Sequence, residues 1–145
     1  MLHPSYPQHP FRIREQTGAH QIFCEARKKW VRLTPEEWVR QNTYQWLVQT
    51  HLFPAALIAL EKEIELSGMK KRFDMLVYSK DHLPWMMIEC KQQSQPLNER
   101  VLLQALRYNI ALPVPFLLLT NGAEACLIEL TEGTWKVLPE MPLHI

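Results

Sequence analysis

Three charged residues lie at the ends of two apolar stretches, "RFDMLVYS" and "WMMIECKQ". Asp74 lies at the start of the first stretch, and Glu89 and Lys91 close the second on either side of Cys90. Residues two apart in a strand share a face, so Glu89 and Lys91 are expected to point the same way. If the stretches form a hairpin that turns near residues 81–82, Asp74 comes close to the end of the second strand. We therefore expect Asp74, Glu89 and Lys91 to converge at one edge of a sheet.

Such a group could bind a divalent cation. Mg²⁺ prefers oxygen ligands, which Asp74, Glu89 and the backbone carbonyl of Cys90 could supply. A neighbouring Lys91 could orient and help deprotonate an attacking water, and could neutralise charge in the transition state. The alternative is a solvated ion pair at two strand ends, which contributes little to stability. The spacing of the three residues leaves both interpretations open.

Segment 33–53 carries the start signals of a helix. Thr34 fits the N-cap and Pro35 fits the first turn. Glu36 and Glu37 suit the positive end of the helix dipole. Glu37 also follows Thr34 by three residues, which predicts a capping box.

The remaining segments alternate like strands or hold turn residues. Residues 1–10 contain three prolines and are expected to form an irregular N-terminal arm. Segment 55–66 is ambiguous and is typical of a strand from about Leu60 onward. The other predicted elements are an N-terminal β-hairpin within 11–33, strands at 72–79, 85–92 and 116–122, a helix at 97–112 and a closing hairpin at 125–140. This order predicts an α/β fold, one domain over 11–145 with a central mixed β-sheet flanked by helices.

The composition limits the classes of protein that fit. A chain of 145 residues that is 47% hydrophobic can build one domain with a substantial core. The net charge of +1 excludes a polycation that holds nucleic acid by bulk charge. None of the four glycines fits a phosphate-binding loop or a dinucleotide fingerprint. The three separated cysteines, and the lack of a signal peptide or a long apolar run, predict reduced thiols in a cytoplasmic protein without a membrane partner.

Five short motifs come in a fixed order along the chain: "LTPEEWVRQ" (33–41), "RFDMLVY" (72–78), "IECKQ" (88–92), "QALRY" (104–108) and "LLTNG" (118–122). With Asp74 and the Glu89-x-Lys91 pair, they resemble the PD-(D/E)XK nuclease superfamily. Together the motifs resemble the N-terminal nuclease domain of type I restriction enzyme R subunits, in its small stand-alone form. The similarity runs from about Phe11 to the C-terminus.

This resemblance implies a restriction-endonuclease-like core and Mg²⁺-dependent hydrolysis of phosphodiester bonds in DNA, for which Mn²⁺ could substitute. We expect an endonuclease rather than an exonuclease. Asp74 and Glu89 match the metal-binding carboxylates of the family, and Lys91 matches its catalytic lysine. The backbone carbonyl of Cys90 fits as a further metal ligand.

Other residues are expected to support the site. Gln104 and Tyr108 match the Q-x-x-x-Y element, and their spacing of four places them on one helix face. Relatives also use a glutamate of the first helix, here Glu36 or Glu37, and Glu36 is preferred because it aligns with an apolar, inward face. Arg72 shares a strand face with Asp74 and could contact phosphate.

The sequence also leaves alternatives open. A complete R subunit carries an ATP-driven translocase, which this chain lacks, so we expect a nuclease domain without a motor. Such a domain could instead be a non-catalytic DNA-binding or assembly module of a restriction, defence or repair system, or could cleave RNA. Partner subunits or a homodimer could restrain its activity. The basic groups at 27–32 and 70–72 are interpreted mainly as solvated turns, apart from Arg72.

Overall fold

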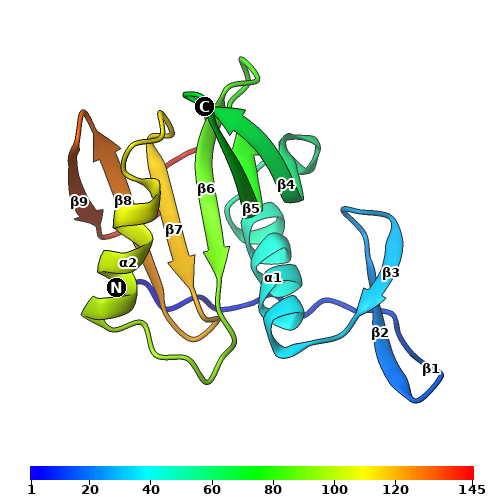
Figure 1. The fold of residues 1–145 in the computed structure, drawn as a ribbon. Helices are drawn as coiled ribbons and strands as arrows, with labels where there is room; N and C mark the ends of the chain where they lie inside the picture. The colour runs from blue at the N-terminus through cyan, green and yellow to red at the C-terminus, as the bar shows by residue number, and fades with distance from the viewer.

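The computed structural model describes residues 1–145, which form one large and one small β-sheet with two α-helices (Figure 1). The large sheet has six strands in the order β4-β5-β6-β7-β8-β9. These strands are β4 (Ile58–Leu66), β5 (Met69–Tyr78), β6 (Pro84–Cys90), β7 (Phe116–Thr120), β8 (Ala125–Thr131) and β9 (Thr134–Leu138). Neighbours run antiparallel except β6 and β7, which are parallel and are joined through α2 (Glu99–Asn109). The sheet is therefore mixed, as predicted.

The two faces of this sheet carry separate apolar cores. One face packs against α1 (Pro35–Gln45) and buries Met75, Ile88 and Leu118 with Leu47, which follows the helix. The other face packs against α2 and buries Phe73, Met87 and Leu117 with Leu106 of that helix. The central strand β7 is buried on both faces, which explains its continuous apolar sequence. The predicted α/β class with helices flanking a central sheet is confirmed.

The first helix begins as the sequence predicts. Thr34 is the N-cap, and its side-chain oxygen accepts a hydrogen bond from the backbone N–H of Glu37. The predicted capping box is half formed, because the Glu37 carboxylate binds arginine side chains and does not return to the cap. Beyond α1 the chain continues through one wide turn, the π-helix Trp46–Thr50, before a 3₁₀ turn at Ala55–Leu57 leads into β4.

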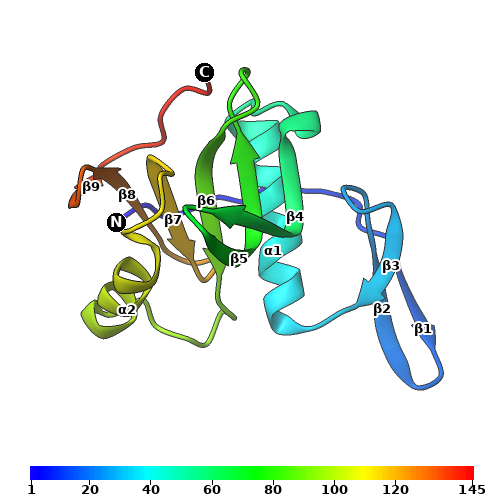
Figure 2. The ribbon, with the colours of Figure 1, turned by 45° about the horizontal axis from the view of Figure 1, so that its top comes forward.

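The N-terminal part is a three-stranded antiparallel sheet, one strand larger than the predicted hairpin. Its strands are β1 (Ile13–Gln16), β2 (Ala19–Cys24) and β3 (Lys29–Arg32). Figures 1 and 2 show this small sheet beside α1, at the opposite side of the molecule from β8, β9 and α2. Residues 1–10 contain no helix or strand, but Leu2 pairs with Ala125 of β8 through two backbone hydrogen bonds. The division of the chain into an arm and one domain stays a prediction.

Segment 55–66 forms β4 from Ile58 onward, so its ambiguous first half is a short 3₁₀ turn followed by strand. The three cysteines are free and buried, in agreement with the expectation. No helix is both long and apolar enough to cross a bilayer.

Candidate metal and phosphate site

The backbone pairing between strands β5 and β6 stops next to Asp74. A hydrogen bond to the side chain of this residue links the two strands there instead. Regular pairing between the strands ends at Met75 and Ile88. Beyond that pair, Oδ2 of Asp74 accepts a hydrogen bond from the backbone N–H of Cys90 at 2.7 Å. Phe73 and Met75 point into different cores although residues two apart should share a face, so the strand twists locally at Asp74. This twist holds the Asp74 carboxylate between the two faces of the sheet, beside the end of β6.

On the α1 side, the other oxygen of Asp74 meets a buried arginine. Nη2 of Arg40 donates to Oδ1 of Asp74 at 3.1 Å and to Glu36 at 3.0 Å, and Nη1 of Arg40 donates to Glu37. Burial alone would lower the pKa of Arg40, but the charges of Glu37 and Asp74 raise it overall. Arg40 therefore stays charged and is a fixed cationic partner for Asp74.

The same cluster extends to the N-terminal sheet and to β4. Arg27 forms an ion pair with Glu37, and its Nη1 donates to Oε2 of Glu61 at 2.8 Å. Glu61 has a positive φ of 50° inside β4, a conformation uncommon for a residue with a side chain. The prediction that Arg27 is part of a solvated turn is wrong, because its side chain is 11% exposed and is paired with carboxylates.

The preference for Glu36 as the inward glutamate of the first helix is also wrong. The Glu36 side chain is 49% exposed, whereas Glu37 is buried. The apolar pattern did not identify the buried glutamate, because residues 39–47 are buried around almost the whole circumference of the helix. One side of α1 faces the large sheet and another faces the small sheet and the arm (Figure 2). A metal-binding role of either glutamate stays a prediction.

On the α2 side, Glu89 lies close to Asp74 without a comparable partner. Burial and the neighbouring charge of Asp74 raise the pKa of Glu89 to about 7, although the charges of Lys71 and Lys91 oppose the shift. No lysine or arginine nitrogen lies within ion-pair distance of the Glu89 carboxylate. Two carboxylates are thus held together at a cost that a cation between them would relieve.

Lys71 also lies in this region, and the prediction that it is part of a solvated turn is wrong. Its side chain is buried, and its Nζ has no hydrogen-bond partner. The ammonium lies over the ring of Tyr108 and 5.9 Å from the ring centre of Phe73. Burial lowers its pKa, while the charge of Glu89 acts in the opposite direction. Lys71 and Phe73 are buried and Arg72 is exposed, so the strand alternation of β5 already includes Lys71.

Most of the predicted site residues line one cavity of about 570 Å³. Glu89 and Lys91 line it from the end of β6, Arg72 from β5, and Gln104 and Tyr108 from α2. Lys91 is fixed by its backbone N–H, which donates to the carbonyl oxygen of Thr120 at 2.8 Å. The structure therefore brings these side chains together, and their chemical roles stay predictions.

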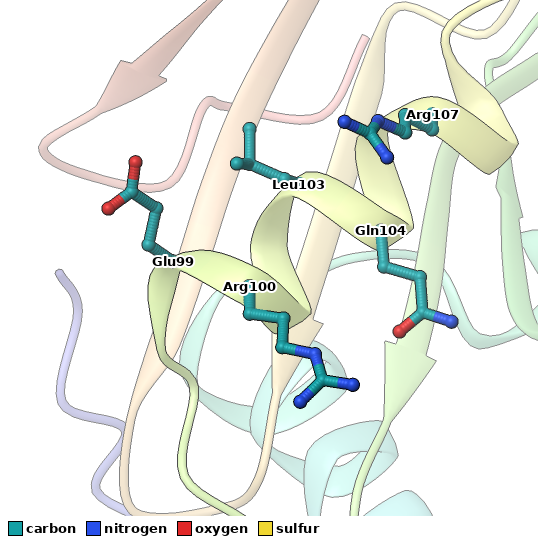
Figure 3. Close-up of a pocket in the computed structure, with 5 residues that line it drawn as sticks. All are labelled: Glu99, Arg100, Leu103, Gln104 and Arg107. Atoms are coloured by element: carbon teal, nitrogen blue, oxygen red, sulfur yellow. The ribbon is translucent and has the colours of Figure 1, made fainter.

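A shallow hollow adjoins this cavity along the outer surface of α2. Figure 3 shows Arg100, Gln104 and Arg107 along the helix, with Glu99 and Leu103 beside them. Gln104 and Arg107 line both the hollow and the cavity. Two exposed guanidinium groups thus border the route to Glu89 and Lys91.

The candidate ligands for a metal are few. No group of three or more His, Cys, Asp or Glu side chains is arranged to hold a metal ion. Asp74 and Glu89 supply two carboxylates, so a cation bound here would complete its shell with backbone carbonyls, water or substrate oxygens. Mg²⁺ accepts such a mixed set and usually keeps several waters.

Comparison with known proteins adds independent information. A family model described as the N terminus of the type I restriction enzyme R protein matches residues 35–142. A search of curated proteins found no match. Among solved structures, a DUF820 protein from Anabaena variabilis, proposed to be a nuclease, matches with a TM-score of 0.49 and 11% sequence identity, over 88% of this chain and 80% of that one.

Proposed function

The chain belongs to the family of type I restriction enzyme R protein N termini, and on this premise we propose that it is a metal-dependent DNA nuclease. The observation that carries the proposal is the pair Asp74 and Glu89 at the split between β5 and β6. Lys91 follows Glu89 by two residues and lines the same cavity. An endonuclease acting on DNA, with Mg²⁺ as the natural ion, is the specific form we propose.

Asp74 and Glu89 are the residues proposed to hold the cation. Both Asp74 oxygens already accept one hydrogen bond each, and a carboxylate oxygen has a further lone pair for a metal. The backbone carbonyl of Cys90 is proposed as a third ligand. When bound, the cation would supply charge stabilisation for the phosphoryl group and a more acidic water.

The other residues of the cavity act on the substrate in this proposal. Lys91 orients the attacking water and places a positive charge beside the developing charge on the phosphoryl oxygens. Arg72 and Arg107 are placed to pair with flanking phosphates. Gln104 and Tyr108 offer an amide and a hydroxyl to the sugar-phosphate backbone.

A second candidate function is supported by Arg40. This buried guanidinium already pairs with Asp74 at 3.1 Å, so it competes with a cation for the same carboxylate. If Arg40 wins that competition, the chain is a non-catalytic DNA-binding or assembly module. Partner subunits or a second copy of the chain could then complete or restrain the site.

Incubation of the purified chain with supercoiled and linear plasmid separates the two candidates. We expect nicking or cleavage with Mg²⁺ or Mn²⁺, no cleavage in EDTA, and loss of cleavage in Asp74→Asn and Lys91→Ala. Asp81→Asn and Lys80→Ala make the same chemical changes in the exposed β5–β6 turn and should cleave like the wild type. Cleavage that survives in Lys91→Ala would contradict the assignment. DNA binding without any cleavage would favour the module. Parallel incubation with RNA tests the third alternative.

A further inference from the structure

The small sheet β1–β3 lies outside the part of the chain that matches the family, which begins at residue 35. It also differs in charge. Residues 1–34 contain six basic and two acidic residues, a net charge of +4, whereas residues 35–145 contain ten basic and thirteen acidic residues, a net charge of −3. The small net charge of the chain is therefore the sum of a basic segment, residues 1–34, and an acidic segment, residues 35–145.

The basic residues gather on one face of the small sheet. Cross-strand partners share a face, so the pairing of Arg14 with Gln21, and of Gln21 with Arg32, places both arginines on the same side. Phe23 and Trp30 are paired on that side too. The opposite face carries Ile22, which is completely buried toward the core. The arginine face therefore points outward.

Two of the arginines, Arg12 and Arg14, lie over aromatic rings. The guanidinium of Arg12 lies 4.7 Å from the ring centre of Phe23 and 5.3 Å from that of Trp30. The guanidinium of Arg14 lies 4.2 Å from the ring centre of Trp30. Arginine stacked in this way keeps its N–H groups free at the edge and loses less rotational freedom when it binds an anion.

No carboxylate lies on this face to neutralise it. Glu15 pairs with His20 across the strands on the opposite side, at 3.8 Å. Glu25 lies beyond the end of β2 and is bound by His9 and Gln45. Arg14 donates to the neutral amide oxygen of Gln21, which leaves its charge uncompensated.

The arginine face is continuous with the candidate active site. Arg32 lines a hollow of about 560 Å³ together with Arg40 and Gln92. Its lining also includes Glu36, Glu37 and Glu61, whose carboxylates are paired with Arg27 or Arg40. Gln92 directly follows Lys91, and Arg40 contacts Asp74. A nucleic-acid strand that crossed this hollow would run from the small sheet to the place where β5 and β6 separate.

We propose that the outward face of β1–β3, formed by Arg12 and Arg14 over Phe23 and Trp30 together with the neighbouring Arg32, binds the phosphate backbone of duplex DNA. This inference rests on the proposed function for the choice of DNA as the polyanion. The stacked guanidinium groups present forked N–H donors that match phosphate oxygens. Because the rings are covered by guanidinium groups, they are not open platforms for unstacked bases, which favours duplex over single-stranded DNA.

The test is binding of a fluorescent duplex in EDTA, measured by anisotropy over a series of salt concentrations. The test variant is Arg12→Gln/Arg14→Gln/Arg32→Gln. The matched control is Lys62→Gln/Lys80→Gln/Lys136→Gln, which removes three exposed charges elsewhere. We expect the test variant to bind at least about tenfold more weakly at low salt, and its log–log salt slope to fall by roughly 2 to 3. The control should stay within about threefold of the wild type.

Several outcomes overturn the inference. Equal weakening in the test and control variants would show a bulk charge effect only. Tighter binding of a single strand, lost in the test variant, would contradict the duplex assignment, and no binding by the wild type would contradict the surface itself. Circular dichroism of the test variant checks that the small sheet is still folded.

Cleavage assays on the same proteins test the proposed nuclease activity independently of DNA binding. If the test variant loses binding but no protein cleaves DNA with Mg²⁺ or Mn²⁺, the DNA surface stands and the nuclease fails. If the test variant cleaves with unchanged KM and kcat, the nuclease stands and the surface fails.

Discussion

The two sides of Asp74 differ in how their charges are paired. On the α1 side, Arg40 and Glu37 are buried and linked to each other and to Asp74 by short contacts. On the α2 side, Glu89 has no ion pair and Lys71 is buried without a hydrogen bond. Unpaired buried charge is costly, so folding alone does not account for the second arrangement.

The difference in pairing indicates a structural role for the α1 side of Asp74 and a chemical role for the α2 side. On the α1 side an ion-pair network links α1 to β5, and only Nε of Arg40 lacks a hydrogen-bond partner there. An unpaired carboxylate beside two lysines keeps its ligand capacity for a cation or a phosphate. We therefore place the chemistry on the α2 side, with Asp74 shared between the two sides.

The largest effect on stability is expected on the paired side. Arg40→Ala leaves the half-buried Asp74 without its cation and leaves Glu37 with Arg27 alone, and should lower the free energy of unfolding by about 3–5 kcal/mol. Urea denaturation followed by tryptophan fluorescence measures this change. A loss below about 1 kcal/mol would show that the network is not structural, and the contrast would disappear.

The pH dependence tests the unpaired side. The pKa of Glu89 is raised to about 7, so between the unfolded and folded values the folded chain binds more protons than the unfolded chain. Stability should therefore fall as pH rises through this window. We expect the wild type to lose roughly 1–3 kcal/mol more than Glu89→Gln between about pH 5 and about pH 8. Parallel stability profiles of the two proteins would contradict the shifted pKa.

Lys71 provides a sharper comparison with Arg40, since both are buried cations. Lys71→Met removes an ammonium that has no hydrogen bond and keeps most of the apolar side chain. Its free energy of unfolding should stay within about 1 kcal/mol of the wild type. A loss similar to that of Arg40→Ala in the same urea experiment would show that Lys71 is paired in solution.

The smallest effect is expected at Glu36. Its side chain is half exposed, and its contact with Arg40 at 3.0 Å is one of several that Arg40 makes. Glu36→Gln should change the free energy of unfolding by less than about 0.5 kcal/mol. If cleavage is also unchanged, Glu36 is not a metal ligand; a large loss of cleavage without a loss of stability would restore it as one.

The sequence predicted the parts of the site that depend on local geometry. Strand alternation placed Glu89 and Lys91 together, and helical spacing placed Gln104 and Tyr108 on one face of the cavity. The sheet class and the central buried strand followed from the apolar pattern in the same way.

Long-range contacts could not be predicted from local patterns. Nothing near Arg40 in the sequence shows that α1 directs this residue at the split between β5 and β6. Glu36 was preferred over Glu37 because the contribution of the small sheet to burying α1 is a tertiary effect. Lys71 was missed because a run of three basic residues resembles a solvated turn when the strand register is unknown.

The central claim, a cation held by Asp74 and Glu89, is tested most directly by calorimetric titration of Mn²⁺ into the metal-free chain at about pH 8, where Glu89 with its pKa near 7 is ionised. We expect one Mn²⁺ per chain, abolished by Asp74→Asn and by Glu89→Gln but retained by Lys91→Ala. Repeated at about pH 6.5, binding should weaken and release protons as Glu89 ionises. Equal Mn²⁺ binding by the wild type and by Asp74→Asn would contradict the claim.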